Sequence, residues 1–424
     1  MYYHSASFYE FYLNTGGSVV NFVFISPNFP SSYENFCIGL HENGVNVLGI
    51  GDAPYDSLTS QLKAALTEYY RVDSLKNYDQ MIRAMGHFTA NYGKIDWVES
   101  NNEYWMELDA SLRTDFNIQS GLKSDQIMRF RSKSTMKKYY KKAGVPTARC
   151  ILVTDMEAAQ EFIAETGYPV IVKPDRGVGS EATWRLENDE DLREFFRALP
   201  EIPYVMEEYI SGIVETYDGI VNSKGEVLFA ASHISPNAIM DMVNEGIPCY
   251  YYVNNKVAPD IEKAGKKVLK AFDVRCRFFH LEFFRLTKDI PGIGKKGSVA
   301  GLEVNMRPAG GFTTDMINYG QSADVFRIWA DMIAFDEVRH SFSGPQRYCV
   351  YCGRRDENSY THTDVALVDV YRESLSLTTR MPDALSGVMG NRVFIGCFDT
   401  IQEMNRFVRY AFSPSPYVPS EEES

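Results

Sequence analysis

The sequence has no apolar run approaching the roughly 20 residues that a membrane-spanning helix needs, so we exclude a transmembrane protein. It is also short of positive charge, because 43 Lys and Arg against 56 Asp and Glu give a formal net charge of −13. This balance argues against general binding to nucleic acid or to an anionic membrane, although a local basic pocket stays open. Cysteine is scarce too: seven scattered residues among 424 are typical of a reducing compartment and predict a cytoplasmic protein.

The remaining composition is that of a folded, soluble chain. Hydrophobic residues make up 45% and charged residues 23%, and the length predicts two to three domains. Residues 1–18 are polar and aromatic without the basic start of a signal peptide, so we interpret them as an extension. Residues 414–424, rich in Pro, Ser and Glu, are predicted to form a tail.

The pattern along the chain predicts the fold class α/β. In residues 19–125, apolar strands at 19–25 and 44–51 alternate with helical stretches, which indicates a small open parallel sheet. The first strand is not followed by GxGxxG, so dinucleotide binding is weakly supported. Three further units are predicted, at residues 126–205, 206–342 and 343–413.

The most informative motif combines an acid, an amide and a guanidinium. Side chains two apart on a strand point the same way, so Glu303, Asn305 and Arg307 share one face. Such a set can hold a hard cation through oxygen and an anion through forked hydrogen bonds. Gly310 and Gly311 follow and let the backbone approach a ligand closely.

A second carboxylate, Glu282, lies on an aromatic strand where burial without a partner would be costly. If Glu282 and Glu303 lie on neighbouring antiparallel strands, they form a clamp for Mg²⁺, which favours one or two carboxylates plus nucleotide phosphates. The alternative for either residue alone is the charged outer face of an edge hairpin.

Two lysines are candidates for phosphate binding. Lys173 ends an apolar strand before a turn in which exposed backbone N–H groups could cradle phosphates; this turn contains Gly177, Gly179 and Ser180. Lys133 opens a basic helix. Each lysine alone is more simply explained as a solvated surface residue.

A strand that leads into a hinge can offer backbone groups to an adenine edge, and a later carboxylate can accept the ribose hydroxyls. The candidates for these roles are Glu207, Glu208, Tyr209, Ile210 and Glu215. The alternative is a polar strand and turn without a ligand.

In this order, the motifs resemble the ATP-grasp superfamily, within it the carboxylate–amine ligases and the biotin-carboxylase-like branch. The likeness covers about residues 19–340. It rests on Lys133 ahead of Ala-Gly-Val-Pro-Thr, Tyr-Pro-Val-Ile-Val before Lys173, Glu-Glu-Tyr-Ile-Ser-Gly at 207–212, and Glu282 with Glu-x-Asn-x-Arg.

The resemblance implies a nucleotide site and an activity. Lys133 and Lys173 would bind the phosphates of ATP, the loop 175–180 would close over them, residues 207–210 would hold adenine, and Glu215 would hold ribose. One or two Mg²⁺ ions, with Mn²⁺ as an alternative, would bind Glu282, Glu303 and Asn305. Arg307 and Lys173 would act in catalysis, with Gly310 and Gly311 beside the substrate.

The implied reaction joins a small-molecule carboxylate to an amine through an acyl phosphate, in an enzyme with a lid subdomain. An ATP-dependent phosphotransferase and a non-catalytic nucleotide-binding module stay open as alternatives. No nucleic acid or membrane partner is expected, and the oligomeric state is left open, with a homodimer among the alternatives.

Weaker features complete the candidates. Cys349 and Cys352 form a lone CxxC, which favours a structural or surface thiol pair over a metal site. His233 could line the substrate pocket but is better explained as a structural histidine. The loop 235–253 could close over the second substrate, and an ordinary surface excursion is an equal alternative.

Overall fold

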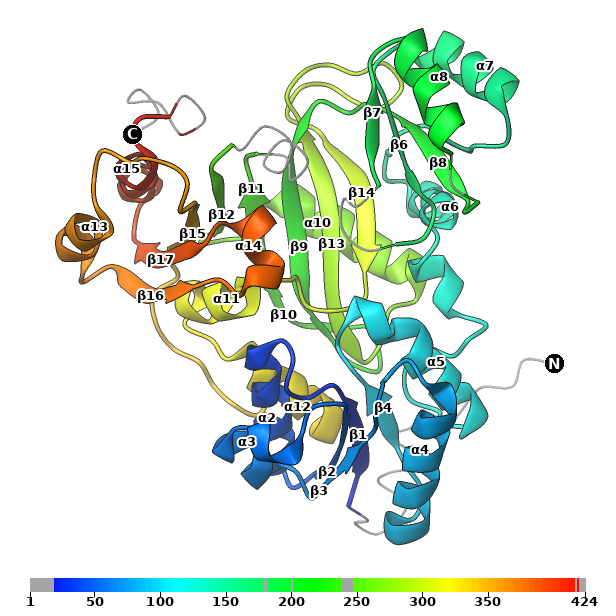
Figure 1. The fold of residues 1–424 in the computed structure, drawn as a ribbon, viewed down its shortest axis with the longest axis vertical. Helices are drawn as coiled ribbons and strands as arrows, with labels where there is room; N and C mark the ends of the chain where they lie inside the picture. The colour runs from blue at the N-terminus through cyan, green and yellow to red at the C-terminus, as the bar shows by residue number, and fades with distance from the viewer. Residues whose placement is uncertain (1–18, 178–181, 200, 238–246, 416–417, 419–424) are drawn as a thin grey trace.

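The computed structural model describes residues 19–177, 182–199, 201–237, 247–415 and 418. The predicted extension 1–18, most of the tail, and Gly179 and Ser180 therefore lie outside the described residues. Three β-sheets organise this part of the chain. In Figure 1 the N-terminal sheet lies at the bottom and the large sheet in the middle. The small sheet of residues 150–208, which we call the lid, lies at the upper right. No described helix combines the length and the apolar character needed to cross a membrane.

The N-terminal unit is a parallel four-stranded sheet, as the alternating pattern predicts. Its strand order is β3-β2-β1-β4, and every neighbouring pair is parallel. The strands are β1 (Asn21–Ile25), β2 (Asn46–Gly51), β3 (Glu68–Arg71) and β4 (Trp97–Glu99). The connections contain α2 (Glu34–Glu42), α3 (Ser60–Ala65), α4 (Tyr78–Tyr92), α5 (Met106–Asp115) and the short turns η1 (Ser31–Tyr33), η2 (Tyr55–Ser57) and η3 (Glu103–Trp105).

This sheet is fastened to the rest of the molecule through α2 and α12 (Val325–Phe335), which lie side by side in Figure 1. A Cβ added to Gly39 of α2 would stand 3.0 Å from the Cβ of Ala330, so a glycine at this position allows the two helices to approach closely. Trp329 packs edge-on against Phe36 with ring centroids 4.9 Å apart. The two helices α2 and α12 therefore contribute to one continuous apolar core.

The lid is a small antiparallel sheet of order β5-β8-β6-β7. It follows η4 (Ile127–Phe130) and α6 (Lys133–Ala143), which Ser132 caps at its start and Gly144 ends in the left-handed conformation. Its elements are β5 (Cys150–Leu152), α7 (Met156–Thr166), β6 (Val170–Pro174), β7 (Trp184–Leu186), α8 (Asp189–Ala198) and β8 (Tyr204–Glu208).

The large sheet has nine strands in the order β14-β13-β9-β11-β12-β15-β17-β16, with β10 paired to β9. All pairings between these strands in the described residues are antiparallel. Its strands are β9 (Gly212–Val221), β10 (Val227–Ala231), β11 (His233–Ser235), β12 (Cys249–Val253), β13 (Arg277–Leu286), β14 (Val299–Asn305), β15 (Tyr348–Arg354), β16 (Leu375–Arg380) and β17 (Arg392–Phe398). Because β12 pairs with β15, residues 343–413 extend the sheet formed by residues 206–342.

Helices cover both faces of this sheet. One face packs on α6 and α10 (Pro259–Phe272), where Leu281 and Val304 are fully buried. The opposite face of the same strands packs on α12 and on α11 (Thr313–Gln321). Around β15 and β17 lie α13 (Asp364–Tyr371), α14 (Asp383–Met389) and α15 (Ile401–Phe412).

A buried ionic cluster joins the N-terminal unit to the large sheet. Glu99 at the end of β4 accepts hydrogen bonds from Arg113 of α5, at 2.8 Å, and from Arg277 of β13. All three are at most 6% exposed. Since an unpaired charge is costly in such surroundings, these groups depend on one another.

We therefore expect Glu99→Ala to lower the free energy of unfolding by about 3–5 kcal/mol, because it leaves two arginines without their carboxylate. Urea denaturation followed by circular dichroism measures the effect. The matched control is Glu194→Ala on α8, an exposed carboxylate whose loss should stay within about 0.5 kcal/mol. Equal midpoints for the two variants would contradict this role.

Candidate active site

The site is built on the register of three neighbouring strands. Glu282 of β13 lies opposite Glu303 of β14, and His280 lies opposite Asn305. On its other side, β13 pairs His280 with Asp218 of β9. Paired residues point to the same face of an antiparallel sheet, so all five side chains share the face away from α10. The predicted placement of Glu282 and Glu303 on adjacent antiparallel strands is thus observed.

Two carboxylates directly opposite each other repel, so their pairing needs compensating cations. Lys133 Nζ lies 3.2 Å from Glu303 Oε1, and His280 Nε2 lies 2.9 Å from Glu282 Oε1. Asn305 adds an amide oxygen on the same face. Carboxylate and amide oxygens clustered beside a lysine are a donor set that fits Mg²⁺.

A chain of hydrogen bonds holds Glu282, one of the two carboxylates of the predicted Mg²⁺ clamp, in position. Asp218, which is buried, lies 2.8 Å from His233 Nδ1 and 2.6 Å from His280 Nδ1, and Thr216 donates to it at 2.6 Å. Burial alone would lower the pKa of His280, but Asp218 and Glu282 outweigh it and raise the pKa to about 9. His280 is therefore charged at neutral pH and donates from both nitrogens, which orients Glu282.

The ligand atoms of Asp218, His233 and His280 lie within 4.8 Å of one another, a spacing that a metal ion could also bridge. The hydrogen bonds among them already account for this spacing. His233, considered in the sequence as either a structural residue or part of the substrate pocket, is hydrogen-bonded and half-buried at the edge of the site.

The two lysines that the sequence predicts to bind phosphate lie close together near the start of α6. Asp175, two residues after Lys173, accepts the backbone N–H of Ser134 at 2.8 Å, which ties the loop after β6 to the start of α6. Lys133 Nζ donates to the carbonyl of Gly177 at 3.4 Å. The helix start and the loop thus bring the two predicted lysines to one place, as Figure 1 shows for α6 and β6.

Glu207 lies between two lysines, an arrangement that its predicted role near adenine did not include. Its two oxygens lie 3.0 Å from Lys137 Nζ and 3.0 Å from Lys173 Nζ. Burial would raise the pKa of Glu207, yet the two ammonium groups lower it to about 2. The trio carries a net charge of +1 and holds Lys173 in place beside Glu303.

The residues after Glu207 have separate surroundings. Glu208 points to the other side of β8, where it binds Arg149 through a side-chain pair at 2.7 Å and the backbone N–H at 2.7 Å. Arg185 stacks over the ring of Tyr209 at 4.7 Å. Ile210 is buried in a small apolar cluster with Leu286.

Glu215 is the predicted site residue that the structure places apart. It pairs with Phe283, so its side chain lies on the α10 face, opposite to that of Glu282 and Glu303. There it accepts a hydrogen bond from Arg285 Nε at 2.5 Å, and Arg285 also binds Asp260 of α10. Because side chains alternate along a strand, a shift of one residue is enough to send this carboxylate to the wrong face.

Arg307 lies at the end of the clamp strand and is shared with the N-terminal unit. Its Nε and Nη2 donate to Glu103 of η3 at 2.9 and 2.7 Å. Arg131 binds the other oxygen of Glu103 at 2.8 Å. This forked pairing shows that the guanidinium is presented in a geometry suited to an anionic group.

Gly310 and Gly311 lie exposed just before α11 and next to the tyrosine-rich strand β12. Gly311 has φ +64°, a conformation that favours glycine, and a Cβ there would stand 3.3 Å from the hydroxyl of Tyr251. Thr313 donates to the carbonyl of Gly310 at 2.8 Å. Tyr251, within the predicted substrate loop 235–253, therefore borders the glycine pair, while residues 238–246 lie outside the described residues.

Sequence reasoning missed four residues of this site. Lys137 follows Lys133 by one helical turn, and this i, i+4 spacing was a usable signal. His280 precedes Glu282 by two residues and so shares its strand face, which was also visible. Asp218 and Glu103 contact their partners only because of the strand order and the packing of the units. No local sequence pattern predicts these contacts.

Comparison with known proteins adds evidence on the fold. The family model described as carbamoyl-phosphate synthase L chain, ATP binding domain, matches residues 132–203. The chain is 26% identical over 233 residues to an L-arginine-specific L-amino acid ligase of Bacillus subtilis, covering 53% of this chain and 54% of that protein. The chain spans about half the length, or less, of the curated relatives that it matches first.

Solved structures agree over nearly the whole chain. An L-amino acid ligase from Bacillus licheniformis superposes with a TM-score of 0.67 at 15% identity, covering 93% of this chain and 97% of that one. The biotin carboxylase domain of a Hydrogenobacter thermophilus 2-oxoglutarate carboxylase, solved with MgADP, ADP and bicarbonate, gives 0.66 at 15% identity, with 93% and 90% covered. The chain has the ATP-grasp fold. The predicted fold class, and the resemblance to this branch, are confirmed.

The lysine–glutamate–lysine trio of this ATP-grasp chain predicts a pH dependence of stability. The pKa of Glu207 is about 2 in the folded protein, against an ordinary value of 4.5, so its contribution is present above pH 4.5 and is lost as the pH falls toward 2. We expect the stability difference between the wild type and Glu207→Gln to shrink by about 1.4 kcal/mol between pH 7 and pH 3.5, because only about one pKa unit of the shift lies in that range.

Urea denaturation at pH 7, 5 and 3.5 measures this difference. Glu161→Gln on α7 of the lid, an exposed site, is the matched control and should show a pH-independent difference near zero. A difference for Glu207→Gln that stays constant with pH would refute the trio as an ionic unit.

Proposed function

We propose that this protein is an ATP-dependent ligase that joins a small-molecule carboxylate to an amine through an acyl-phosphate intermediate. The observation that carries the proposal is the pairing of Glu282 with Glu303 while Lys133 contacts Glu303. An acidic clamp in contact with a phosphate-binding cation suits a nucleotide triphosphate whose charge is shared between a divalent ion and lysine.

For the nucleotide, several features favour ATP bound between the lid and the large sheet. The lid provides Lys173 and the end of β8, and α6 provides Lys133 and Lys137. Solved proteins of this fold contain ADP or MgADP. In the structure these lysines are paired with carboxylates, so a bound polyphosphate would replace the Lys133–Glu303 contact with contacts to phosphate oxygens.

Glu282, Glu303 and Asn305 would hold one or two Mg²⁺ ions. A bound divalent ion supplies Lewis-acid stabilisation of the charge that develops on the transferring phosphoryl group. The chain's own part is to keep these oxygens aligned, which the Asp218–His280 hydrogen bonds do for Glu282.

The reaction follows from the placement of the cations. A substrate carboxylate oxygen attacks the γ-phosphorus, the bond to ADP breaks, and Lys133 and Lys173 stabilise the charge on the phosphoryl oxygens. The amine then attacks the acyl carbon, phosphate departs, and the amine loses a proton. Arg307, two residues beyond β14, would stabilise the acyl phosphate, and the glycine pair would admit the carboxylate.

Small amino acids are the first substrates to test, because L-amino acid ligases are among the similar proteins. With a productive acid, ATP and Mg²⁺, hydroxylamine should yield a hydroxamate together with ADP, since it intercepts an acyl phosphate. A stable phosphorylated product would instead identify a phosphotransferase. Neither product across a broad panel of acids and amines would overturn the proposed ligase.

Substitutions in the clamp test the metal assignment. We expect Glu303→Gln and Glu282→Gln each to lower the rate of ADP release by about 10²–10³-fold, because each removes a preorganised charged group. Glu215→Gln is the matched control on the opposite face of the sheet and should stay within about threefold. Thermal stabilisation by MgADP should be lost in the clamp variants and kept in Glu215→Gln.

Near-native ADP release by Glu303→Gln would contradict the clamp. A large loss in Glu215→Gln with unchanged melting temperature would show that this carboxylate reaches the nucleotide after all.

A further inference from the structure

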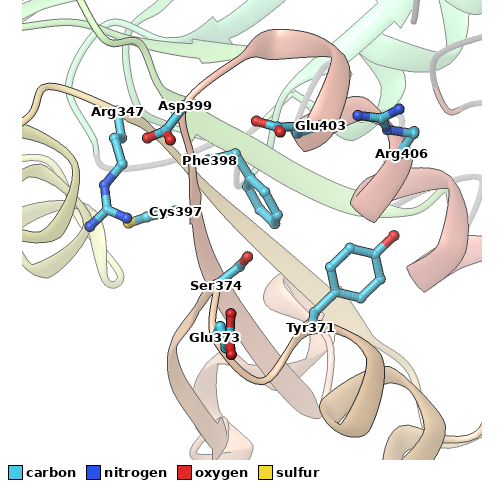
Figure 2. A pocket seen from close by; sticks show the side chains of 9 residues that line it. All are labelled: Arg347, Tyr371, Glu373, Ser374, Cys397, Phe398, Asp399, Glu403 and Arg406. Carbon is cyan, nitrogen blue, oxygen red and sulfur yellow. The ribbon is translucent and has the colours of Figure 1, made fainter.

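A cavity of about 400 Å³ lies away from the candidate active site, between β17, α15 and the segment that follows α13 (Figure 2). One of the residues that line it is Cys397, near the end of β17. This residue is 3% exposed, whereas Cys349 on the neighbouring strand is fully buried. The cavity therefore offers the way by which a small molecule reaches one of these two thiols.

Cys397 and Cys349 lie directly opposite each other on β17 and β15. The backbone N–H of Cys397 donates to Ser374, on the β16 side. Toward β15 the two cysteines are therefore a non-hydrogen-bonded pair, the class in which Cα atoms are about 4.5 Å apart and side chains are closest. A disulfide accepts Cα separations of about 4.4–6.8 Å, so this register allows one without moving the strands.

Three groups surround the sulfur of Cys397. Ser376 donates its hydroxyl to Sγ at 3.5 Å, and the thiol of Cys349 also hydrogen-bonds to it. The guanidinium of Arg347 ends beside the sulfur, as Figure 2 shows. The Cys349 hydrogen bond is the main cause that lowers the pKa of Cys397, against burial and with help from Ser376 and Arg347, to about 7.

The pKa values of the other cysteines are shifted in the opposite direction. All seven cysteines lie in the described part of the chain. Burial raises the pKa of Cys150, Cys249 and Cys276 to about 12, and it raises the pKa values of Cys37 and Cys352 still further.

The CxxC interpretation also changes. Cys349 and Cys352 are three residues apart on one strand, so they point to opposite faces and pack in different cores. Cys349 and Cys352 are therefore buried structural thiols and not a surface pair, and the thiol that faces Cys349 is Cys397.

We propose that Cys397 is a reactive thiolate that hydroperoxides oxidise, and that Cys349 resolves the product into a cross-strand disulfide. The Cys397 thiolate attacks one peroxide oxygen, the O–O bond breaks, and sulfenic acid and hydroxide form. Cys349 then gives its proton to the departing hydroxyl and attacks the sulfur, so that an S–S bond forms, the S–O bond breaks and water leaves. Two thiols lose two electrons; with hydrogen peroxide the products are two waters, because the hydroxide takes up the proton that the Cys397 thiol released, and an organic hydroperoxide gives one water and an alcohol.

The test treats the intact native protein with a few equivalents of hydrogen peroxide and maps its cysteines by mass spectrometry. We expect two thiols to disappear, one linked peptide pair containing Cys349 and Cys397, and full recovery with dithiothreitol. Oxidation of other cysteines first, or a disulfide between a different pair, would overturn the proposal.

Variants separate the two roles. Cys349→Ser should stop the reaction at sulfenic acid on Cys397, trapped by dimedone, and Cys397→Ser should abolish both products. Cys352→Ser is the matched control and should leave the linked pair unchanged. Arg347→Gln should slow alkylation of Cys397 by iodoacetamide by about three- to tenfold, because it removes a cation that favours the thiolate. An unchanged rate in a folded Arg347→Gln protein would remove Arg347 from the mechanism.

Discussion

The antiparallel register between β9, β13 and β14 is the constraint on which the site depends. It sets Asp218 beside His280 and Glu282 beside Glu303, so that three strands deliver their polar residues to one face. The opposite face of the same strands carries Leu281 and Val304 into the core with α10. A slip of one residue would exchange the two sets, and the cost of burying the acids keeps the register unique.

Charge compensation explains how so many ionic groups tolerate burial together. Each carboxylate of the site has a cation at contact distance: Lys133 for Glu303, His280 for Glu282, and two lysines for Glu207. An arrangement of this kind stabilises the buried carboxylates and keeps strongly polarising groups in place.

Local motifs predicted what lies on one element, and they failed where partners come from distant parts of the chain. The strand motif around Glu303 and the glycine end of α6 were readable because their periodicity is local. Glu215 shows the limit, since the motif named the right strand but the alternation of side chains sends this carboxylate to the other face. The pairing of Cys349 with Cys397 depends on β15 lying beside β17, about 50 residues later, which no short-range pattern encodes.

The ion pairs Glu103–Arg307 and Glu99–Arg277 make the N-terminal unit a structural part of the half of the chain that carries the candidate site. A fragment of residues 132–415 would lack Glu99 and Glu103, so Arg277 and Arg307 would lose their counter-ions. It would also expose the apolar surface of α12 that α2 covers. The boundary that looks natural from the sheets is therefore a poor place to cut the chain. Any shortened version has to carry both carboxylates with it.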